Sequence, residues 1–255
     1  EDEVLTADTS ALADEDVLGA LSYQWSRDGS PIDGATSDNY TLTQEDVGAA
    51  ITVAVSYTDG EGTAESVTSS ATSAVANVND EPTLDALSDI NINEDDPEQT
   101  VNLTGITANG GEVQQLRVTA VSDNTGLIPD PTVTYSSADS TGTLKFTPVA
   151  DQFGTATITV TVEDGGLDNN LATPGDNGVI NRTFSVMVAP INDEPTGGVG
   201  ITGTATEDEV LTADTSALAD EDVLGVLSYQ WSRDGGPIDG ATSDNYTLTQ
   251  EDVGA

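Results

Sequence analysis

Carboxylates are the side chains of this sequence that could do chemistry. The 255 residues include 46 Asp and Glu against five Lys and Arg, a formal net charge of −41, with no His and no Cys. Without His and Cys there is no histidine base, thiol nucleophile, disulfide or conventional zinc, haem or iron–sulfur site. Carboxylates serve as paired acid and base in glycosidases, or as oxygen ligands of hard cations such as Ca²⁺.

A catalytic use of the carboxylates is not favoured, so we expect a protein that is not an enzyme. A glycosidase pair needs a cleft and one carboxyl with a raised pKa, and no segment of the sequence predicts a cleft. Gly110-Gly111 and Gly165-Gly166 lack the strand–loop–helix context and nearby Lys of a phosphate-binding loop. The negative field disfavours nucleic acid and anionic lipid surfaces as partners. No apolar run is long enough for membrane insertion.

A long internal repeat organises the chain. Residues 1–49 recur as residues 207–255 at an offset of 206, and only Ala20, which becomes Val226, and Ser30, which becomes Gly236, differ. Such similarity indicates a tandem array whose repeating unit is about two domains long. We expect the array to continue beyond both ends of this chain, because residues 199–206 before the second copy have no counterpart before Glu1.

Two acidic linkers divide the sequence, residues 77–82 (NVNDEP) and 190–195 (PINDEP). Each follows a segment of alternating apolar residues and ends in a Pro, which cannot continue a strand ladder. This spacing predicts an N-terminally incomplete domain at 1–79, a complete domain at 80–192 and the start of a second copy of the first domain at 193–255.

Apolar residues alternate with Thr and Ser in short segments, which predicts an all-β fold. In the first domain Leu21, Tyr23 and Trp25 share one face of an expected strand, which makes Trp25 a core residue. The competing interpretation, an exposed sugar-stacking platform, is disfavoured by this alternation. A buried Trp followed by an acidic corner and a further strand resembles the immunoglobulin-like sandwich. Val53 stands near the place where that fold usually has a disulfide Cys.

The middle domain shows seven strand-like segments at the spacing expected of a β-sandwich. They lie at Thr83–Leu87 and around residues 101–106, 116–120, 133–135, 144–146, 158–162 and 184–188. If these strands run alternately up and down, acidic loops gather at both ends of each sandwich. Each linker then lies between carboxylates of two domains.

Several short motifs resemble the cadherin-like tandem repeats of giant bacterial surface proteins, including RTX-type adhesins. They are the two NDEP linkers, residues 93–96 (NEDD), residues 146–148 (FTP) and residues 162–166 (VEDGG). The resemblance covers essentially the whole chain. It implies tandem Ig-like and cadherin-like β-sandwich domains in an elongated array, located outside the cell or at a bacterial cell surface.

The resemblance also implies calcium at the junctions. Cadherins hold Ca²⁺ there with a D-x-N-D-N linker, an early Glu and acids of the following domain, and Ca²⁺ takes 6 to 8 oxygen ligands. Residues 77–81 match that linker with Asn first and Glu last, whereas Pro190 removes the first ligand of the second linker, so fewer ions per junction are expected. The ligands implied at the first junction are Glu1, Asp46, Asn79, Asp80, Glu112 and Asp164. Those implied at the second are Glu94, Asp151, Asn192, Asp193, Asp220 and Asp222.

The sequence thus predicts a non-catalytic structural repeat of a secreted or surface protein, a calcium-stiffened stalk or spacer of an adhesin. Two alternatives stay open. One is a subunit of an extracellular filament assembled by strand complementation, and the other is a calcium-dependent carbohydrate-binding module. Expected partners are Ca²⁺, neighbouring repeats or identical chains, and surface glycans. The competing explanation for the acids is a solvated surface, as in halophile proteins.

Overall fold

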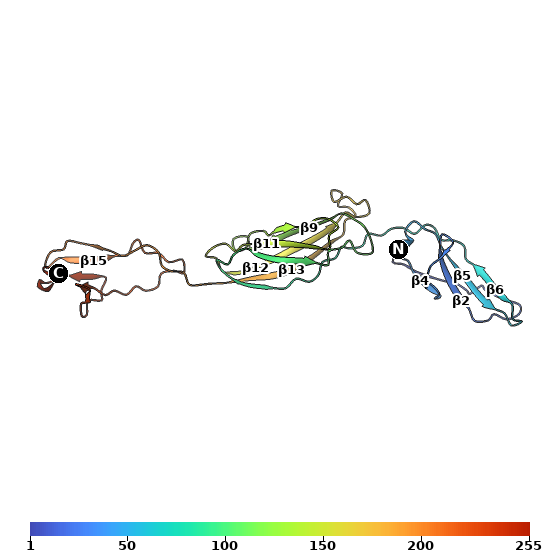
Figure 1. The fold of residues 1–255 in the computed structure, drawn as a ribbon, viewed down its shortest axis with the longest axis horizontal. Helices are drawn as coiled ribbons and strands as arrows, with labels where there is room; N and C mark the ends of the chain where they lie inside the picture. Colours follow the sequence, from blue (N-terminus) through green and yellow to red (C-terminus); the bar gives the residue numbers. More distant parts are fainter.

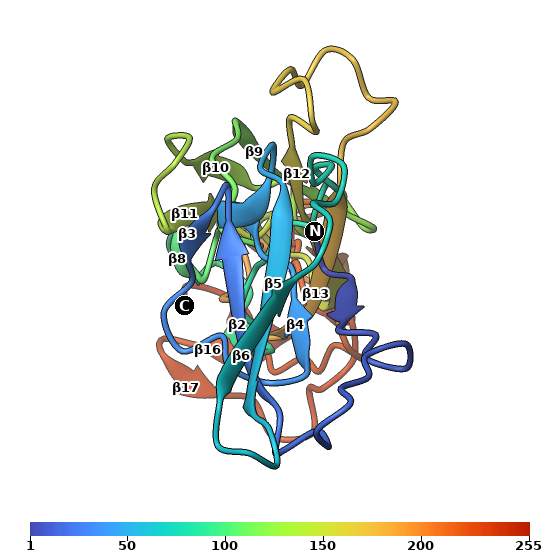
Figure 2. The same cartoon turned by 90° about the vertical axis from the view of Figure 1, so that its right-hand side faces the viewer.

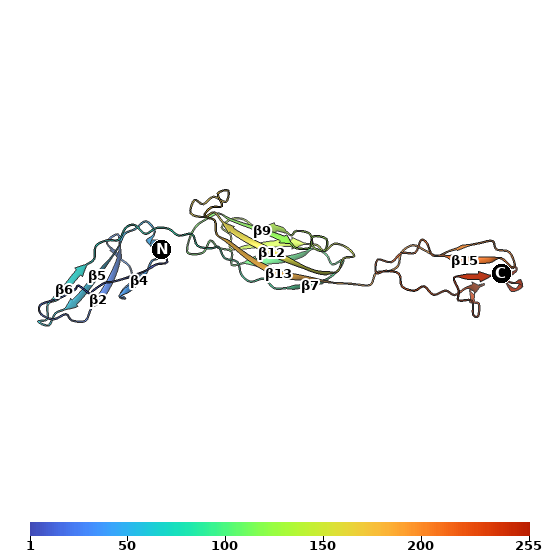
Figure 3. The ribbon, with the colours of Figure 1, turned by 180° about the vertical axis from the view of Figure 1, so that it is seen from behind.

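The computed structural model describes residues 1–255 as three β-rich units arranged end to end (Figure 1, and from behind in Figure 3). We call them the N-terminal, middle and C-terminal units, separated by the linkers 77–82 and 190–195. The fold is all-β, as predicted. Its helical segments are two single 3-10 turns, Gln44–Asp46 (η1) and Gln250–Asp252 (η2). No helix combines the length and apolar character that crossing a membrane requires.

The middle unit is a two-layer sandwich. Its strands are β7 (Ile90–Asn93), β8 (Gln99–Thr104), β9 (Leu116–Ser122), β10 (Thr132–Thr134), β11 (Thr141–Phe146), β12 (Gly154–Asp164) and β13 (Val179–Ala189). One sheet has the order β7-β13-β12-β9 and the other β10-β11-β8. All neighbours are antiparallel except β7 and β13, which run parallel. The first and last strands of the unit therefore lie side by side.

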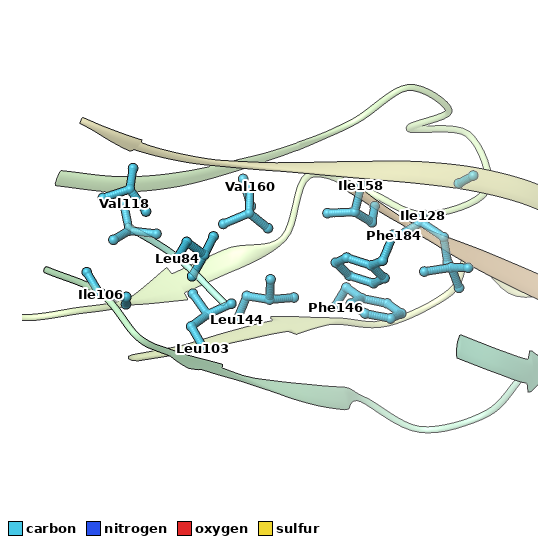
Figure 4. Close-up of a cluster of buried hydrophobic side chains, with 14 of the residues drawn as sticks. Leu84, Leu103, Ile106, Val118, Ile128, Leu144, Phe146, Ile158, Val160 and Phe184 are labelled. Atoms are coloured by element: carbon cyan, nitrogen blue, oxygen red, sulfur yellow. The ribbon is translucent and has the colours of Figure 1, made fainter. Parts of the chain in front are cut away.

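The core of this sandwich follows from strict alternation along its strands. In β12, Ala156, Ile158, Val160 and Val162 are buried while the intervening Thr residues point outward. Leu103 and Leu144, with Phe146, meet them from the other sheet, and 19 buried side chains form one cluster. Figure 4 shows side chains of this cluster projecting from both layers into the space between them. Each fully buried side chain of this size contributes roughly 1.5–3 kcal/mol.

The first strand of the middle unit differs from the prediction. Thr83–Leu87 was expected to form it, but the structure gives that segment only an isolated antiparallel bridge from Thr83 to Thr107. The chain then crosses to the other sheet, where Ile90–Asn93 pairs with β13. Leu84 still reaches the core, at 2% exposure. The alternation identified inward residues correctly, but it could not show that the first strand is divided between two sheets.

The N-terminal unit has a smaller core between two sheets. Its strands are β1 (Val4–Thr6), β2 (Ser22–Arg27), β3 (Ser30–Pro31), β4 (Asn39–Thr41), β5 (Ile51–Thr58) and β6 (Ala64–Thr68). The sheets have the orders β3-β2-β5-β6 and β1-β4. Trp25 is only 3% exposed and pairs across the ladder with Val53. The prediction of a core tryptophan is therefore confirmed. Val53, near the position where the immunoglobulin-like sandwich usually has a disulfide Cys, is buried in the same core.

The C-terminal unit repeats part of this architecture. Its strands are β14 (Gly200–Thr202), β15 (Val210–Asp214), β16 (Ser232–Arg233), β17 (Gly236–Pro237) and β18 (Asn245–Thr247), in sheets ordered β14-β15-β18 and β16-β17. By the offset of 206, β15 corresponds to β1 and β18 to β4. None of its residues is fully buried.

In Figure 2, which views the row of units end on, the loop between β12 and β13 projects sideways from the middle unit.

Leu144→Ala tests the middle core, because Leu144 is fully buried. We expect it to lower the unfolding free energy of the middle unit by about 2–5 kcal/mol, the cost of lost burial plus a cavity. Native-state hydrogen exchange of the β12 amides measures this. Val121→Ala, at a position 53% exposed on β9, is the control and should change it by about 0.5 kcal/mol or less. Equal effects of the two substitutions would contradict the described packing.

Candidate functional site

The two linkers share one hydrogen-bonding scheme with the acids around them. A Glu of the preceding unit accepts a hydrogen bond from a linker N–H: Val78 N donates to Glu1 Oε1 at 3.1 Å, and Ile191 N donates to Glu94 Oε1 at 2.7 Å. The Asp two residues later donates its own N–H to an acid of the following unit. The junctions therefore have the same construction although their linker sequences differ.

At the first junction, Asp80 and Glu112 form the contact with the following unit. Asp80 N donates to Glu112 Oε2 at 3.2 Å, and Asn77 Nδ2 donates to Glu112 Oε1 at 3.1 Å. Glu112 lies in the loop between β8 and β9, at the end of the middle sandwich that faces the linker. Glu1 is 6% exposed, and its backbone N donates to Ala76 O at 2.8 Å.

A second group of contacts centres on Asn79. Its Nδ2 lies 3.3 and 3.4 Å from the two oxygens of Asp164, and its Oδ1 accepts from Gln114 Nε2 at 2.7 Å. Asp164 is the last residue of β12 and is fully buried, with Oδ1 accepting from Gly166 N and Gly178 N. The end of this long strand therefore fixes one carboxylate directly against the linker.

Burial and repulsion disfavour the charged form of two of these acids. Burial raises the pKa of Asp80, and the charge of Asp2 raises it further. Burial is also the largest cause of the raised pKa of Glu112, to which Asp80 and Glu1 add repulsion, although hydrogen bonds from Asp80 N and Asn77 oppose it. These carboxylates lack a compensating positive charge.

Some oxygen atoms at this junction are buried without a hydrogen-bond partner. They are Asp80 Oδ2 and Gln114 Oε1. Gly110, at φ +53°, leaves room for the first of these, because a Cβ at that position would collide with Asp80 Oδ2. Buried acceptors without partners are costly, and two lone acceptors near other carboxylates have the chemistry of ligands for a hard cation.

The second junction gathers carboxylates more tightly. Oxygens of Glu94, Asp193 and Asp222 lie within 4.8 Å of one another, and so do oxygens of Asp95, Asp151 and Asp193. Asp193 therefore belongs to both groups. Burial raises its pKa, and the charges of Asp95, Asp151, Asp222 and Glu94 raise it further.

Backbone groups hold this arrangement in place. Asp193 N donates to Asp222 Oδ2 at 2.7 Å, and Asp222 N donates to Asp220 Oδ1 at 2.9 Å. Asp151 N donates to Asp95 Oδ1 at 3.3 Å. Asn192 Nδ2 bonds to the carbonyl of Asp193 rather than to a carboxylate. Acids from the turn after β7, the loop before β12, the linker and the C-terminal unit thus converge on one place.

Asp46 differs from the other residues implied at the first junction. It is fully buried, and its oxygens accept from Arg27 Nε at 2.7 Å, Tyr40 Oη at 2.8 Å and Thr43 N at 2.8 Å. Burial raises its pKa, but the hydrogen bonds from Thr43, Arg27 and Tyr40 outweigh that effect and lower it. Its carboxylate is thus engaged by hydrogen bonds from residues of the N-terminal unit.

The few cationic side chains are engaged away from the linkers. Arg27 pairs with Glu45 and Asp46, and Arg233 pairs with the equivalent Glu251 and Asp252. The remaining ion pairs join Arg117 to Glu163 and Lys145 to Glu98, while Arg182 Nε donates to Leu84 O at 3.0 Å. The carboxylates at the linkers therefore face backbone N–H groups, amides and one another.

Sequence reasoning missed several members of these clusters. The structure brings Glu1, Asn79, Asp80, Glu112 and Asp164 around the first linker, and it adds Asn77 and Gln114. At the second junction it adds Asp95. Asp95 was signalled by the acidic run at residues 93–96. The amides carry no charge, so no charge pattern could single them out.

Comparisons with known proteins find weak structural similarity only. No protein-family model and no curated protein matches the chain. Among solved structures, domains 4 and 5 of the S-layer protein SbsC are 18% identical, with a TM-score of 0.32, over 66% of this chain and 70% of that one. The human desmocollin-1 ectodomain is 12% identical, with a TM-score of 0.30, over 82% and 41%. Zebrafish RET cadherin-like domains 1 to 4 are 14% identical, with a TM-score of 0.26, over 75% and 46%. The description of the fold rests on the strand pairing given above.

Asp46→Asn tests the structural role of Asp46. The amide cannot accept from Arg27, Tyr40 and Thr43 together, so we expect the N-terminal unit to lose about 1–3 kcal/mol of stability. Trp25 fluorescence during urea unfolding, in a Trp231→Phe background, measures this loss. The matched control is Asp252→Asn at the equivalent position of the C-terminal unit, which should leave the Trp25 transition in place. An unchanged midpoint in the Asp46→Asn variant would disprove the role.

Proposed function

We propose that this chain is a non-catalytic structural segment of an extracellular surface protein, a stalk or spacer whose junctions are stiffened by Ca²⁺. The observation that supports this most directly is the sharing of Asp193 between two groups of three carboxylates at the boundary between units. The end-to-end arrangement of the sandwiches gives the stalk its form (Figures 1 and 3). The repeat of 49 residues at an offset of 206 supports a tandem array.

The residues present fit a calcium ion. The donor atoms at both junctions are carboxylate, amide and backbone oxygens, the ligands that Ca²⁺ prefers. At the first junction Glu1, Asp80, Glu112 and Asp164 would hold it, with Asn77 and Asn79 beside them. At the second, Glu94, Asp95, Asp151, Asp193 and Asp222 would do so. Asp80 Oδ2 is buried and has no hydrogen-bond partner in the protein, so it is the oxygen that a bound cation would stabilise most.

Stiffening follows from where these residues lie in the chain. Bound Ca²⁺ would supply positive charge and would be coordinated by several oxygen atoms at once. Glu94 and Asp151 belong to the middle unit, Asp193 to the linker and Asp222 to the C-terminal unit. When all of them are held together, the linker loses its freedom to bend. Without a cation, their mutual repulsion favours separation of the two units.

Small-angle scattering of the full chain in millimolar calcium and in chelator tests this proposal. We expect a longer maximum dimension and a stiffer profile with calcium, because the junction carboxylates are then neutralised. Magnesium at the same concentration is the control, because Mg²⁺ requires a smaller site with octahedral coordination and keeps several of its bound water molecules. Identical profiles in calcium and in chelator would refute stiffening by calcium. They would favour the competing explanation, that the acids form a solvated surface.

Asp193→Asn tests the second junction. This side chain belongs to both carboxylate groups, so its neutralisation should lower calcium affinity there at least about tenfold, which is a change of about 1.4 kcal/mol in binding free energy. Calorimetric titration measures it. Glu194→Gln removes the same charge from the next, exposed linker residue and should leave the affinity within about twofold of the original. Equal losses in the two variants would show nonspecific attraction rather than a site.

The pH dependence should reverse its sign when calcium is removed. In chelator, the raised pKa values of Asp80, Glu112 and Asp193 mean that the folded junctions bind more protons than the unfolded chain. Acidification from pH 7 to about pH 5 should therefore stabilise the protein. In excess calcium the same acidification competes with the metal and should destabilise it. Thermal unfolding in both buffers measures this. A melting temperature that falls equally in both would contradict the proposed sites.

A further inference from the structure

Two Asn-Gly dipeptides occur in the chain, and they lie in different surroundings. Asn109-Gly110 is in the loop between β8 and β9, and Asn177-Gly178 comes directly before β13. In such a dipeptide the backbone nitrogen of Gly can attack the carboxamide carbon of Asn, because glycine has no Cβ to hinder the approach. The attack requires an Asn side chain that can rotate and a Gly N–H that is not held by an acceptor.

Asn109-Gly110 meets both requirements. Asn109 is exposed, and although its backbone N–H donates to Thr107 Oγ1 at 3.1 Å, its carboxamide has no hydrogen-bond partner in the protein. The N–H of Gly110 donates to no acceptor. A hollow of ≈ 600 Å³ borders Gly110 and Gly111, and it leaves room for a ring to close and for water to reach it. Both partners of the attack are therefore available.

Hydrogen bonds hold both members of Asn177-Gly178. Asn177 Nδ2 donates to Glu163 Oε1 at 2.9 Å, and Gly178 N donates to Asp164 Oδ1 at 2.8 Å. Both residues are half-buried, and the space on one side of Gly178 is filled by Asp164 and Pro82. The same attack here would first have to break two hydrogen bonds that end on carboxylates, which are stronger than bonds between neutral groups.

We propose that Asn109 is a site of spontaneous deamidation and that the fold protects Asn177 from the same reaction. Gly110 N forms a bond to Asn109 Cγ and loses its proton to water, while the carboxamide C–N bond breaks and ammonia leaves with a proton in return. Water then opens the cyclic imide at either carbonyl. Opening at one carbonyl leaves an aspartyl residue, and opening at the other leaves an isoaspartyl residue, whose main chain runs through the former side chain. The net reaction consumes water and releases ammonia.

Residue 109 stands where such a change reaches the first junction. Asn109 O accepts from Glu112 N at 2.9 Å and closes a turn in which Gly110 and Gly111 have φ of +53° and +92°. Gly110 lies against Asp80, whose N–H donates to Glu112 Oε2 at 3.2 Å. An isoaspartyl residue adds a methylene to the main chain and turns the carbonyl that accepts from Glu112 into a carboxylate. The turn is lengthened and a negative charge is added beside two acids, so deamidation should loosen Glu112 from the linker.

The junction itself requires the residues that make this loop reactive. A Cβ at position 110 would collide with Asp80 Oδ2, and the φ of +53° there also favours glycine. Residue 109 has a φ of +68°, a region that Asn adopts more readily than most residues. The reactive dipeptide is thus a consequence of how the loop approaches Asp80, and a test substitution belongs at Asn109 rather than at Gly110.

Incubation of the full chain in neutral buffer, with and without urea, tests the proposal. Proteolytic digestion and mass spectrometry measure the conversion of each Asn. In the folded chain we expect Asn109 to react at least about tenfold faster than Asn177, because only Asn177 must break hydrogen bonds first. In urea the two rates should agree within about twofold, since Gly follows both residues. Equal rates in the folded chain, or an unreacted Asn109 when the urea sample has reacted, would overturn the proposal.

Asn109→Gly provides the matched control, because it has no carboxamide and tolerates the positive φ. Hydrogen exchange of the Asp80 amide in fresh and aged chains measures the effect on the junction. The aged original chain should exchange this amide at least about threefold faster than the fresh one, whereas fresh and aged Asn109→Gly chains should agree. Faster exchange in the aged Asn109→Gly chain, or no change in the aged original, would contradict the proposed loosening.

Both experiments are run in calcium and in chelator. Deamidation needs water alone, so conversion of Asn109 in chelator would establish the modification site even if calcium leaves the scattering profile unchanged. The modification and the proposed calcium function can therefore fail separately.

Discussion

Like charges meet wherever this chain passes from one unit to the next, and much of the structure serves to hold them there. Linker N–H groups bond to Glu1 and Glu112 at one junction and to Glu94 and Asp222 at the other. These acids are presented by strand ends and loops, so both sandwiches must be formed before the carboxylates can converge. The cationic side chains are engaged elsewhere. The junctions are therefore the place where solution conditions act on the fold.

Much of the fold could be predicted because a strand has a period of two. That period identified the inward faces of β12 and β13 and the core position of Trp25. It could not place the first strand of the middle unit, because Leu84 and Ile92 are both inward but belong to opposite layers. The choice of layer depends on long-range pairing with β13, about which the local sequence around residue 90 contains no information.

The candidate site was predictable to the extent that charge marks it. The sequence named acids in linkers and loop ends around Asp80 and Asp193, and the structure brings several of them together there, whereas it did not name the uncharged Gln114. Asp46 was given a ligand's role as a carboxylate at a corner, and the sequence did not indicate the hydrogen bonds that it accepts from Arg27, Tyr40 and Thr43. The distinction depends on side chains 3, 6 and 19 residues away that meet only in the folded unit.

The parallel pairing of β7 with β13 determines how the middle unit responds to mechanical tension. Force applied through the two linkers pulls β7 and β13 in opposite directions along their common axis. The four residue pairs from Ile90–Val186 to Asn93–Ala189 then bear the load together, in shear, rather than opening one after another. In a row of such units the linkers would extend first and the sandwiches last.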